Sequence, residues 1–140
     1  MLGLAAALLA FLADRVMKTL ALSENGRGAF VFKATLNSGA VFGLPIPTPA
    51  IAAISALVMA GILVFALRSR SPLGDAGAAF VLLGGLSNLI DRIRLGAVVD
   101  IFSVGLVPLS GVLATFNVSD MMVVLGALLI LRSQRRRSTP

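Results

Sequence analysis

The sequence contains no cysteine, histidine, tryptophan or tyrosine. Without cysteine and histidine, the chain has no disulfides, no thiol catalysis, no Cys/His zinc site and no histidine general base. Acidic residues are also scarce, with 6 Asp and Glu against 12 Lys and Arg. We expect no metal and no cofactor. Any chemistry must therefore depend on a few carboxylates, together with amides, hydroxyls and cations.

Apolar residues make up 58% of the 140 positions, and the mean hydropathy is +1.00. These values predict an integral membrane protein, with one polytopic domain over residues 1–140. Basic residues flank apolar segments in "LRSRSP" (67–72) and "LRSQRRRSTP" (131–140). This is the positive-inside pattern, which we favour over an RNA-binding tail, so no nucleic-acid partner is expected.

The sequence favours an all-α fold with four transmembrane helices. Each segment approaches the roughly 20 apolar residues that a crossing requires: 2–22, 47–67, 74–93 and 117–132. An even number of crossings, with basic residues in the short connection and the tail, predicts cytoplasmic termini and two longer outward connections. The first segment lacks the basic start of a signal peptide, so we expect a retained anchor. Within the first outward connection, "GAFVFKATLN" (28–37) predicts a small β-like cradle between the first two helices.

Polar residues interrupt these segments near their predicted outer ends, where charged groups at membrane depth usually mark functional sites. Asp14 and Lys18 share one helix face, as an anchoring ion pair or as part of a site. Asn37, in "NSGAVFG", suits a tight turn as well as a substrate contact. Such alternatives keep each cluster ambiguous when it is taken alone.

The second half of the chain carries further polar clusters. One helix face is expected to carry Asn88, Asp91 and Arg92 as a network that orients other acids. Asp100 lies between "AVV" and "IF", which makes an ordinary exposed loop acid less probable. Helix capping alone could explain two more residues, with Asn117 at the N-cap and Asp120 at the third helical position.

Together these clusters place several carboxylates at one depth. Two facing carboxylates can share a proton, so that one activates water while the other polarises a carbonyl group, as peptide hydrolysis requires. The residues alone do not decide which two of Asp91, Asp100 and Asp120 form such a pair. A serine mechanism is weaker, because Ser38, Ser87 and Ser119 have no activating base in sequence beyond a lysine, Lys18 or Lys33.

Four ordered motifs resemble those of the lipoprotein signal peptidases, the type II signal peptidases of bacteria. They are "DRVMK" (14–18), "NSGAVFG" (37–43), "GGLSNLIDRIRLGAVVD" (84–100) and "FNVSD" (116–120). The resemblance covers nearly the whole chain. It implies an aspartic protease of the bacterial inner membrane, with its site near the outer face, that cleaves prolipoproteins before a diacylglyceryl-modified cysteine. The implied partners are that precursor and membrane lipids, and a monomer is expected.

The resemblance also assigns roles to individual residues. The catalytic pair would be Asp100 and Asp120. Supporting or substrate-binding residues would be Asp14, Lys18, Asn37, Gly39, Asn88, Asp91, Arg92 and Asn117.

Three positions depart from the family pattern, which commonly has Ala where Val41 and Ser119 stand and Gly where Ser87 stands. The first outward connection also looks shorter than usual. These departures suggest a divergent paralogue, or a factor that binds the lipidated precursor without cutting it. A further alternative is a small proton-coupled transporter or channel subunit, which clustering of the acids near one face disfavours.

Overall fold

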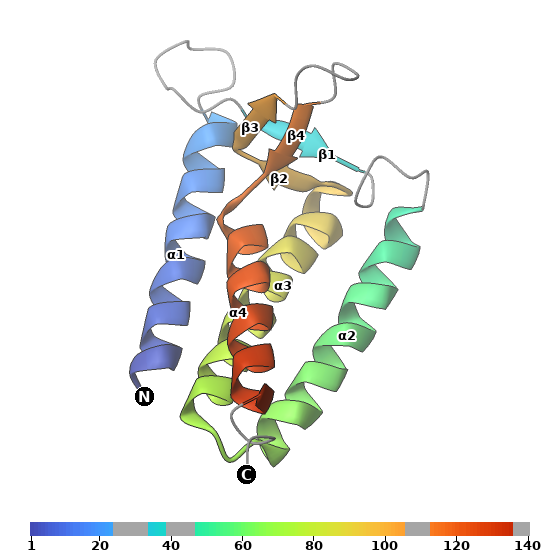
Figure 1. Cartoon of the computed structure of the whole chain (residues 1–140). Helices are drawn as coiled ribbons and strands as arrows, with labels where there is room; N and C mark the ends of the chain where they lie inside the picture. Colours follow the sequence, from blue (N-terminus) through green and yellow to red (C-terminus); the bar gives the residue numbers. More distant parts are fainter. Residues whose placement is uncertain (24–33, 39–46, 106–112, 136–140) are drawn as a thin grey trace.

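A computed structural model describes residues 1–23, 34–38, 47–105 and 113–135 (Figure 1). Four helices run alternately up and down, so the N-terminus and the end of the last helix lie at the same end of the molecule. Short strands gather at the opposite end. The helices are α1 (Leu2–Ser23), α2 (Thr48–Arg68), α3 (Pro72–Leu95) and α4 (Val118–Arg135).

Local signals explain where α3 begins and ends. Ser71 is its N-cap and accepts a hydrogen bond from the Gly74 amide, while Pro72 occupies the first helical position. Gly96 ends the helix in the left-handed conformation, with φ of 70°, and its N–H donates to the Arg92 carbonyl at 3.0 Å. The helix therefore extends two residues beyond each end of the expected 74–93 segment.

Four short strands form two antiparallel pairs at the end of the helices opposite the N-terminus. Asp100 lies opposite Thr35 in the first pair, and Phe102 lies opposite Phe116 in the second. The bounds are β1 (Thr35–Asn37), β2 (Val98–Asp100), β3 (Phe102–Gly105) and β4 (Leu113–Phe116).

The expected cradle is therefore present only in part between the first two helices. Only β1 comes from that connection, whereas the other three described strands lie between α3 and α4, where we expected none. Each of them has only three or four residues, too few for a clear alternation of apolar and polar positions. Residues 28–33 of the expected strand lie outside the described part of the chain.

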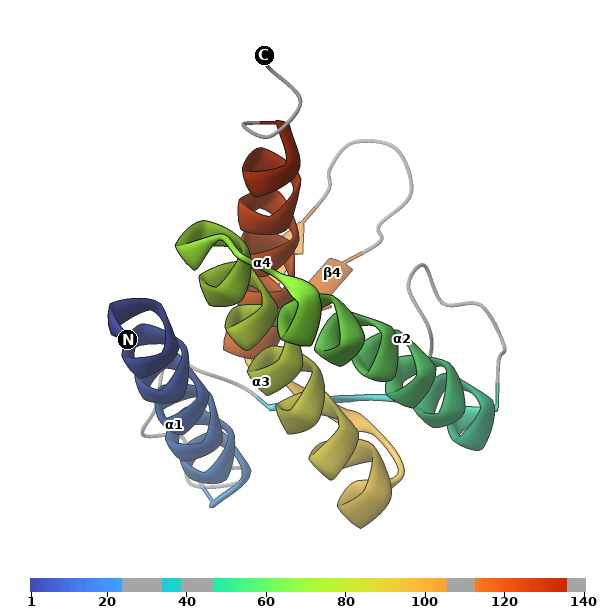
Figure 2. The ribbon, with the colours of Figure 1, turned by 90° about the horizontal axis from the view of Figure 1, so that it is seen from below.

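The central helix is α3, which packs against α1, α2 and α4 (Figure 2). Its contact with α4 is close enough to require glycine. A Cβ atom added to Gly77 would lie 2.7 Å from the Gly126 carbonyl oxygen, and one added to Gly126 would lie 2.5 Å from the Gly77 oxygen. Small residues of this kind let two helix backbones touch.

The interior contains charged and polar side chains beside apolar ones such as Val99 and Met122, and much of the exterior is apolar. The largest fully buried side chains include Lys18, Asp14, Asp91 and Asn117, whereas α2 has no buried residue among its apolar side chains. By length and composition, α2 and α3 can each cross a membrane. The other two helices each carry three charged residues, and their crossing stays a prediction.

Candidate active site

Asp100 ends β2 and is buried, with only 2% of its surface exposed. Pairing of β2 with β1 brings Asn37 near it, and the Asn37 amide donates to Asp100 Oδ2 at 3.0 Å. The Thr115 hydroxyl, from β4, donates to the same oxygen at 2.7 Å. The Asn117 amide donates to Oδ1 at 2.9 Å. From the described residues, Asp100 thus accepts three side-chain hydrogen bonds, and none of these comes from a cation.

Asp120 lies in the first turn of α4 and forms a reciprocal cap with Asn117. Its backbone N–H donates to Asn117 Oδ1 at 2.9 Å, and the Asn117 N–H donates to Asp120 Oδ2 at 3.1 Å. This arrangement is a capping box, so the expected capping role of both residues is present. The cap also joins the two acids, because the same Asn117 side chain bonds Asp100. The same two residues therefore cap α4 and hold Asp120 next to the side chain that bonds Asp100.

Asn88, on α3, provides the second donor to Asp120, with Nδ2 at 2.8 Å from Oδ1. Its own oxygen accepts from Lys18 Nζ at 2.9 Å. An ammonium group can only donate, and a backbone N–H can only donate. Lys18 therefore fixes the Asn88 amide with its NH₂ toward Asp120, and the Asp120 N–H fixes the Asn117 amide with its NH₂ toward Asp100. Both amides are thereby oriented as donors to the carboxylates.

A second pair of acids lies between α1 and α3, behind Asn88. Lys18 Nζ bridges them, at 3.0 Å from Asp14 Oδ2 and 2.8 Å from Asp91 Oδ2. Arg15 forms an ion pair with the other oxygen of Asp91. The Val99 N–H also donates to Asp91, at 3.4 Å, and so attaches β2 to this cluster. These two acids are matched by two cations.

The two serines that depart from the family pattern both contact Asp14. Ser87 Oγ donates to Asp14 Oδ2 at 2.6 Å, and the Ser119 backbone N–H donates to Oδ1 at 2.9 Å. The Ser119 hydroxyl has no hydrogen-bond partner among the described residues. Both serines are fully buried. Neither is placed to attack a substrate, so the geometry disfavours Ser87 and Ser119 as nucleophiles.

The remaining expected site residues have different outcomes. Arg92 is partly buried and donates to the Asn88 carbonyl at 3.4 Å, and its charge acts on Asp91, Asp100 and Asp120. Gly39, like Val41, lies outside the described residues. The sequence analysis missed the roles of Arg15 and Thr115. Arg15 stands within the "DRVMK" motif, whereas nothing in the sequence pairs Thr115 with Asp100.

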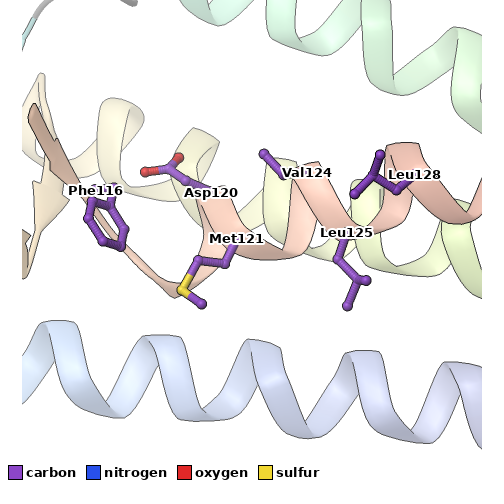
Figure 3. Close-up of a pocket in the computed structure, with 6 residues that line it drawn as sticks. All are labelled: Phe116, Asp120, Met121, Val124, Leu125 and Leu128. Atoms are coloured by element: carbon purple, nitrogen blue, oxygen red, sulfur yellow. The ribbon is translucent and has the colours of Figure 1, made fainter.

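A groove of about 390 Å³ runs along α4 and includes Asp120 near one end (Figure 3). Its other lining residues are all apolar: Phe116, Met121, Val124, Leu125 and Leu128. Asp120 is partly buried and gives this groove its carboxylate. The arrangement can hold an apolar chain beside the Asp120 carboxylate, which Asn117 links to Asp100. Among the described residues, no acid cluster suited to a metal ion is present.

Comparisons with known proteins agree with this arrangement. The sequence model of the family described as "Signal peptidase (SPase) II" matches residues 6–134. A lipoprotein signal peptidase of Chlorobaculum tepidum is 34% identical, with 93% of this chain and 89% of that protein covered. A second lipoprotein signal peptidase, from Pelotomaculum thermopropionicum, is 37% identical in the matched region. That match covers 73% of this chain but only 65% of the length of that protein.

The fold is also shared with solved structures. A bacterial membrane enzyme solved at 2.3 Å resolution by the in meso method superposes with a TM-score of 0.77 at 17% identity, covering 98% of this chain and 89% of that one. A second bacterial membrane enzyme, solved at 1.9 Å, gives a TM-score of 0.73 at 18% identity. The family match extends over nearly the whole described chain and includes both pairs of acids. This chain belongs to the signal peptidase II family.

Proposed function

We propose that this protein is an intramembrane aspartic endopeptidase that removes the signal peptide from prolipoproteins, cutting before the diacylglyceryl-modified cysteine. The observation that carries the proposal is a pair of carboxylates held by neutral donors, one of which, Asp120, lines an apolar groove. Family membership supports signal-peptide removal. The apolar lining of the groove suits the signal peptide or an acyl chain of the lipidated precursor.

In the proposed mechanism, Asp100 and Asp120 share one proton. The ionised carboxylate takes a proton from a water molecule, whose oxygen attacks the scissile carbonyl carbon. The protonated carboxyl group gives its proton to the carbonyl oxygen, which yields a tetrahedral diol. The C–N bond then breaks, and the amine leaves with the proton that the first carboxylate had taken. One hydroxyl of the diol returns its proton to the second carboxylate, which leaves a carboxylic acid product and restores the shared proton. All protons are accounted for by the two acids and one water molecule.

The arrangement in the membrane is part of the proposal. All four helices would cross the bacterial inner membrane, with both termini in the cytoplasm and the strands at the outer face. Exposed apolar side chains on every helix support this arrangement, because soluble proteins rarely expose so much apolar surface. Membrane lipids would surround the chain, which would act as a monomer without a cofactor.

The test is a cleavage assay on purified protein in detergent, with a diacylglyceryl-modified prolipoprotein as substrate. The wild type should release the signal peptide, whereas Asp100→Asn and Asp120→Asn should each lose activity. Asp75→Asn is the matched control, because Asp75 is an exposed acid in the first turn of α3, at the end of that helix remote from the strands. Full activity in both dyad variants would show that the mechanism is wrong.

The assay also separates the alternatives. A precursor-binding factor would retain the lipidated precursor without releasing a peptide. A proton-coupled transporter would carry protons across liposome membranes in a manner that depends on Asp91 or Asp120, and it would leave the precursor intact. The cation pairing of Asp14 and Asp91 counts against a relay, because it fixes two of the acids in ion pairs.

A further inference from the structure

Thr115 is the one hydroxyl group that bonds an acid of the proposed pair in the described part of the chain. It belongs to β4, opposite Ser103 of β3, and it is partly buried. Asn37 and Asn117 bond the same carboxyl group, but both belong to motifs that resemble the family pattern. Thr115 precedes such a motif and has no assigned role.

The hydrogen bonds around Asp100 leave little room for a proton. A carboxylate has about four acceptor positions, two on each oxygen. Asn37 and Thr115 occupy both positions of Oδ2, at 3.0 and 2.7 Å, while Asn117 occupies one position of Oδ1. One position, on Oδ1, remains open. Hydrogen bonds that donate to a carboxylate favour its ionised form.

Asp120 is less fully occupied. Each of its oxygens accepts one hydrogen bond, from Asn88 Nδ2 and from the Asn117 backbone N–H. One position on each oxygen remains, and Asp120 lines the apolar groove where a substrate carbonyl group would lie. Asp120 can therefore carry a proton and donate it outward.

From this difference we infer that Thr115 is a positioning residue that holds Asp100 ionised, which makes Asp100 the general base and Asp120 the acid that protonates the scissile carbonyl. The inference rests on the proposed function. In this assignment the water proton moves to the open position of Asp100 Oδ1, and the Asp120 proton moves to the carbonyl oxygen. Without the Thr115 hydroxyl, a position on Oδ2 opens and a proton can settle there, away from the reacting water.

The β3–β4 pair is what holds the hydroxyl in place. Thr is β-branched, so its side chain has few rotamers in a strand. The neighbouring Phe116 ring lies 5.4 Å from the Phe102 ring, and the Ile101 N–H donates to the Phe116 carbonyl at 3.1 Å. These contacts join β4 to the end of β2, where Asp100 stands. Among the described residues, Arg92 acts on both acids and Lys18 acts on Asp120, and Asp100 and Asp120 act on each other.

The test compares Thr115→Val, which keeps the shape without the hydroxyl, with Thr115→Ser, which keeps the hydroxyl. Ser103→Ala is the matched control, because Ser103 carries an exposed hydroxyl directly opposite Thr115 in the same strand pair. For Thr115→Val we expect kcat to fall about 10-fold or more with KM nearly unchanged, because a hydrogen bond to a charged group is lost. The acidic limb of the pH–rate profile should move to higher pH by about one unit. Thr115→Ser should restore most of both properties.

The outcomes separate this inference from the proposed function. If the wild type cleaves, Asp120→Asn does not, and Thr115→Val behaves as wild type, this inference is wrong and the proposed function stands. A lower kcat with an unchanged acidic limb would also overturn it, because Thr115 would then have only a structural role. Thermal unfolding in detergent identifies a misfolded Thr115→Val protein, in which case the Thr115→Ser profile decides: a wild-type limb supports the inference, and a shifted limb contradicts it. If the wild type cleaves no precursor, the proposed function fails and this inference fails with it.

Discussion

Two pairs of acids lie close together in this protein, and their partners differ in kind. Asp14 and Asp91 contact Lys18 and Arg15, so two negative charges meet two positive charges. Asp100 and Asp120 contact amides, one hydroxyl and one backbone N–H. Neutral donors permit a change of protonation at moderate cost, whereas an ion pair does not. The difference indicates that the first pair maintains the fold and the second pair can perform acid–base chemistry.

The two pairs are nevertheless connected. Lys18 contacts both acids of the first pair, and it also orients the Asn88 amide that donates to Asp120. The cation-paired acids thus hold Lys18 in the position from which it orients a donor of the proposed catalytic pair. Substitution of Lys18 is therefore the most direct test of the difference between the two pairs of acids.

The largest expected effect is on catalysis by the second pair. Asp100→Asn and Asp120→Asn should each lower kcat by about 10³-fold or more, and the double variant should lose little beyond either one, because residues that act as a unit are not additive. Cleavage of the lipidated precursor measures this effect. Thermal unfolding should fall only modestly for each variant, since the asparagine oxygen still accepts on one side while its NH₂ faces a donor on the other. If the loss of kcat in the double variant equalled the product of the two single losses, the two acids would act independently, which would argue against a shared mechanism.

The next largest effect is on stability through the first pair. Lys18→Met removes the ammonium group from two buried carboxylates, and leaving buried charges unpaired costs about 3–5 kcal/mol. Unfolding by denaturant in detergent micelles should show this loss. Arg94→Gln is the control, because Arg94 is exposed near the end of α3. If Lys18→Met were as stable as wild type, the ion pairs of Asp14 and Asp91 would not maintain the fold, and the proposed difference between the two pairs of acids would be wrong.

Much of this arrangement could be predicted from the sequence. Helical spacing placed Asp14 with Lys18 on one face, and the structure pairs them at 3.0 Å. The N-cap and third-position roles of Asn117 and Asp120 follow from their place before an apolar run, and the capping box is present. Both are local relationships within one helix, which spacing alone determines.

The contacts between elements could not be predicted in the same way. Thr115 meets Asp100 only because the chain reverses between β3 and β4, and those strands are too short to give a period. Arg15 was quoted within a motif, but its pairing with Asp91 depends on how α1 packs on α3. Asn88 and Asp91 share one face of α3, yet they contact different pairs of acids. Only the packed structure divides the acids into two sets.

A smaller effect is expected at Asn117, where substitutions can distinguish its role as the N-cap of α4 from its role as a hydrogen-bond donor to Asp100. Serine is nearly as good an N-cap as asparagine, so Asn117→Ser should keep the stability of α4 while it loses the amide donor to Asp100. We expect kcat to fall about 10-fold, from the loss of one hydrogen bond to a charged group. Asn117→Ala should show the same fall in kcat and a further loss of about 1 kcal/mol in unfolding free energy. If Asn117→Ser retained wild-type kcat, Asn117 would be a cap and nothing more.

The smallest effect concerns the two serines beside Asp14. Ser87→Ala removes a 2.6 Å hydrogen bond to a buried carboxylate that keeps its Lys18 partner, so a loss of about 1 kcal/mol is expected. Ser119→Ala keeps the backbone N–H that bonds Asp14 and removes a hydroxyl with no partner among the described residues, so stability should change by less than about 0.5 kcal/mol or rise slightly. Unfolding in detergent compares the two proteins, and both should retain wild-type kcat. A lower kcat in Ser87→Ala at unchanged stability would mean that the cation-paired acids influence the chemistry directly, because the Ser87 hydroxyl bonds only Asp14 and Arg15 among the described residues.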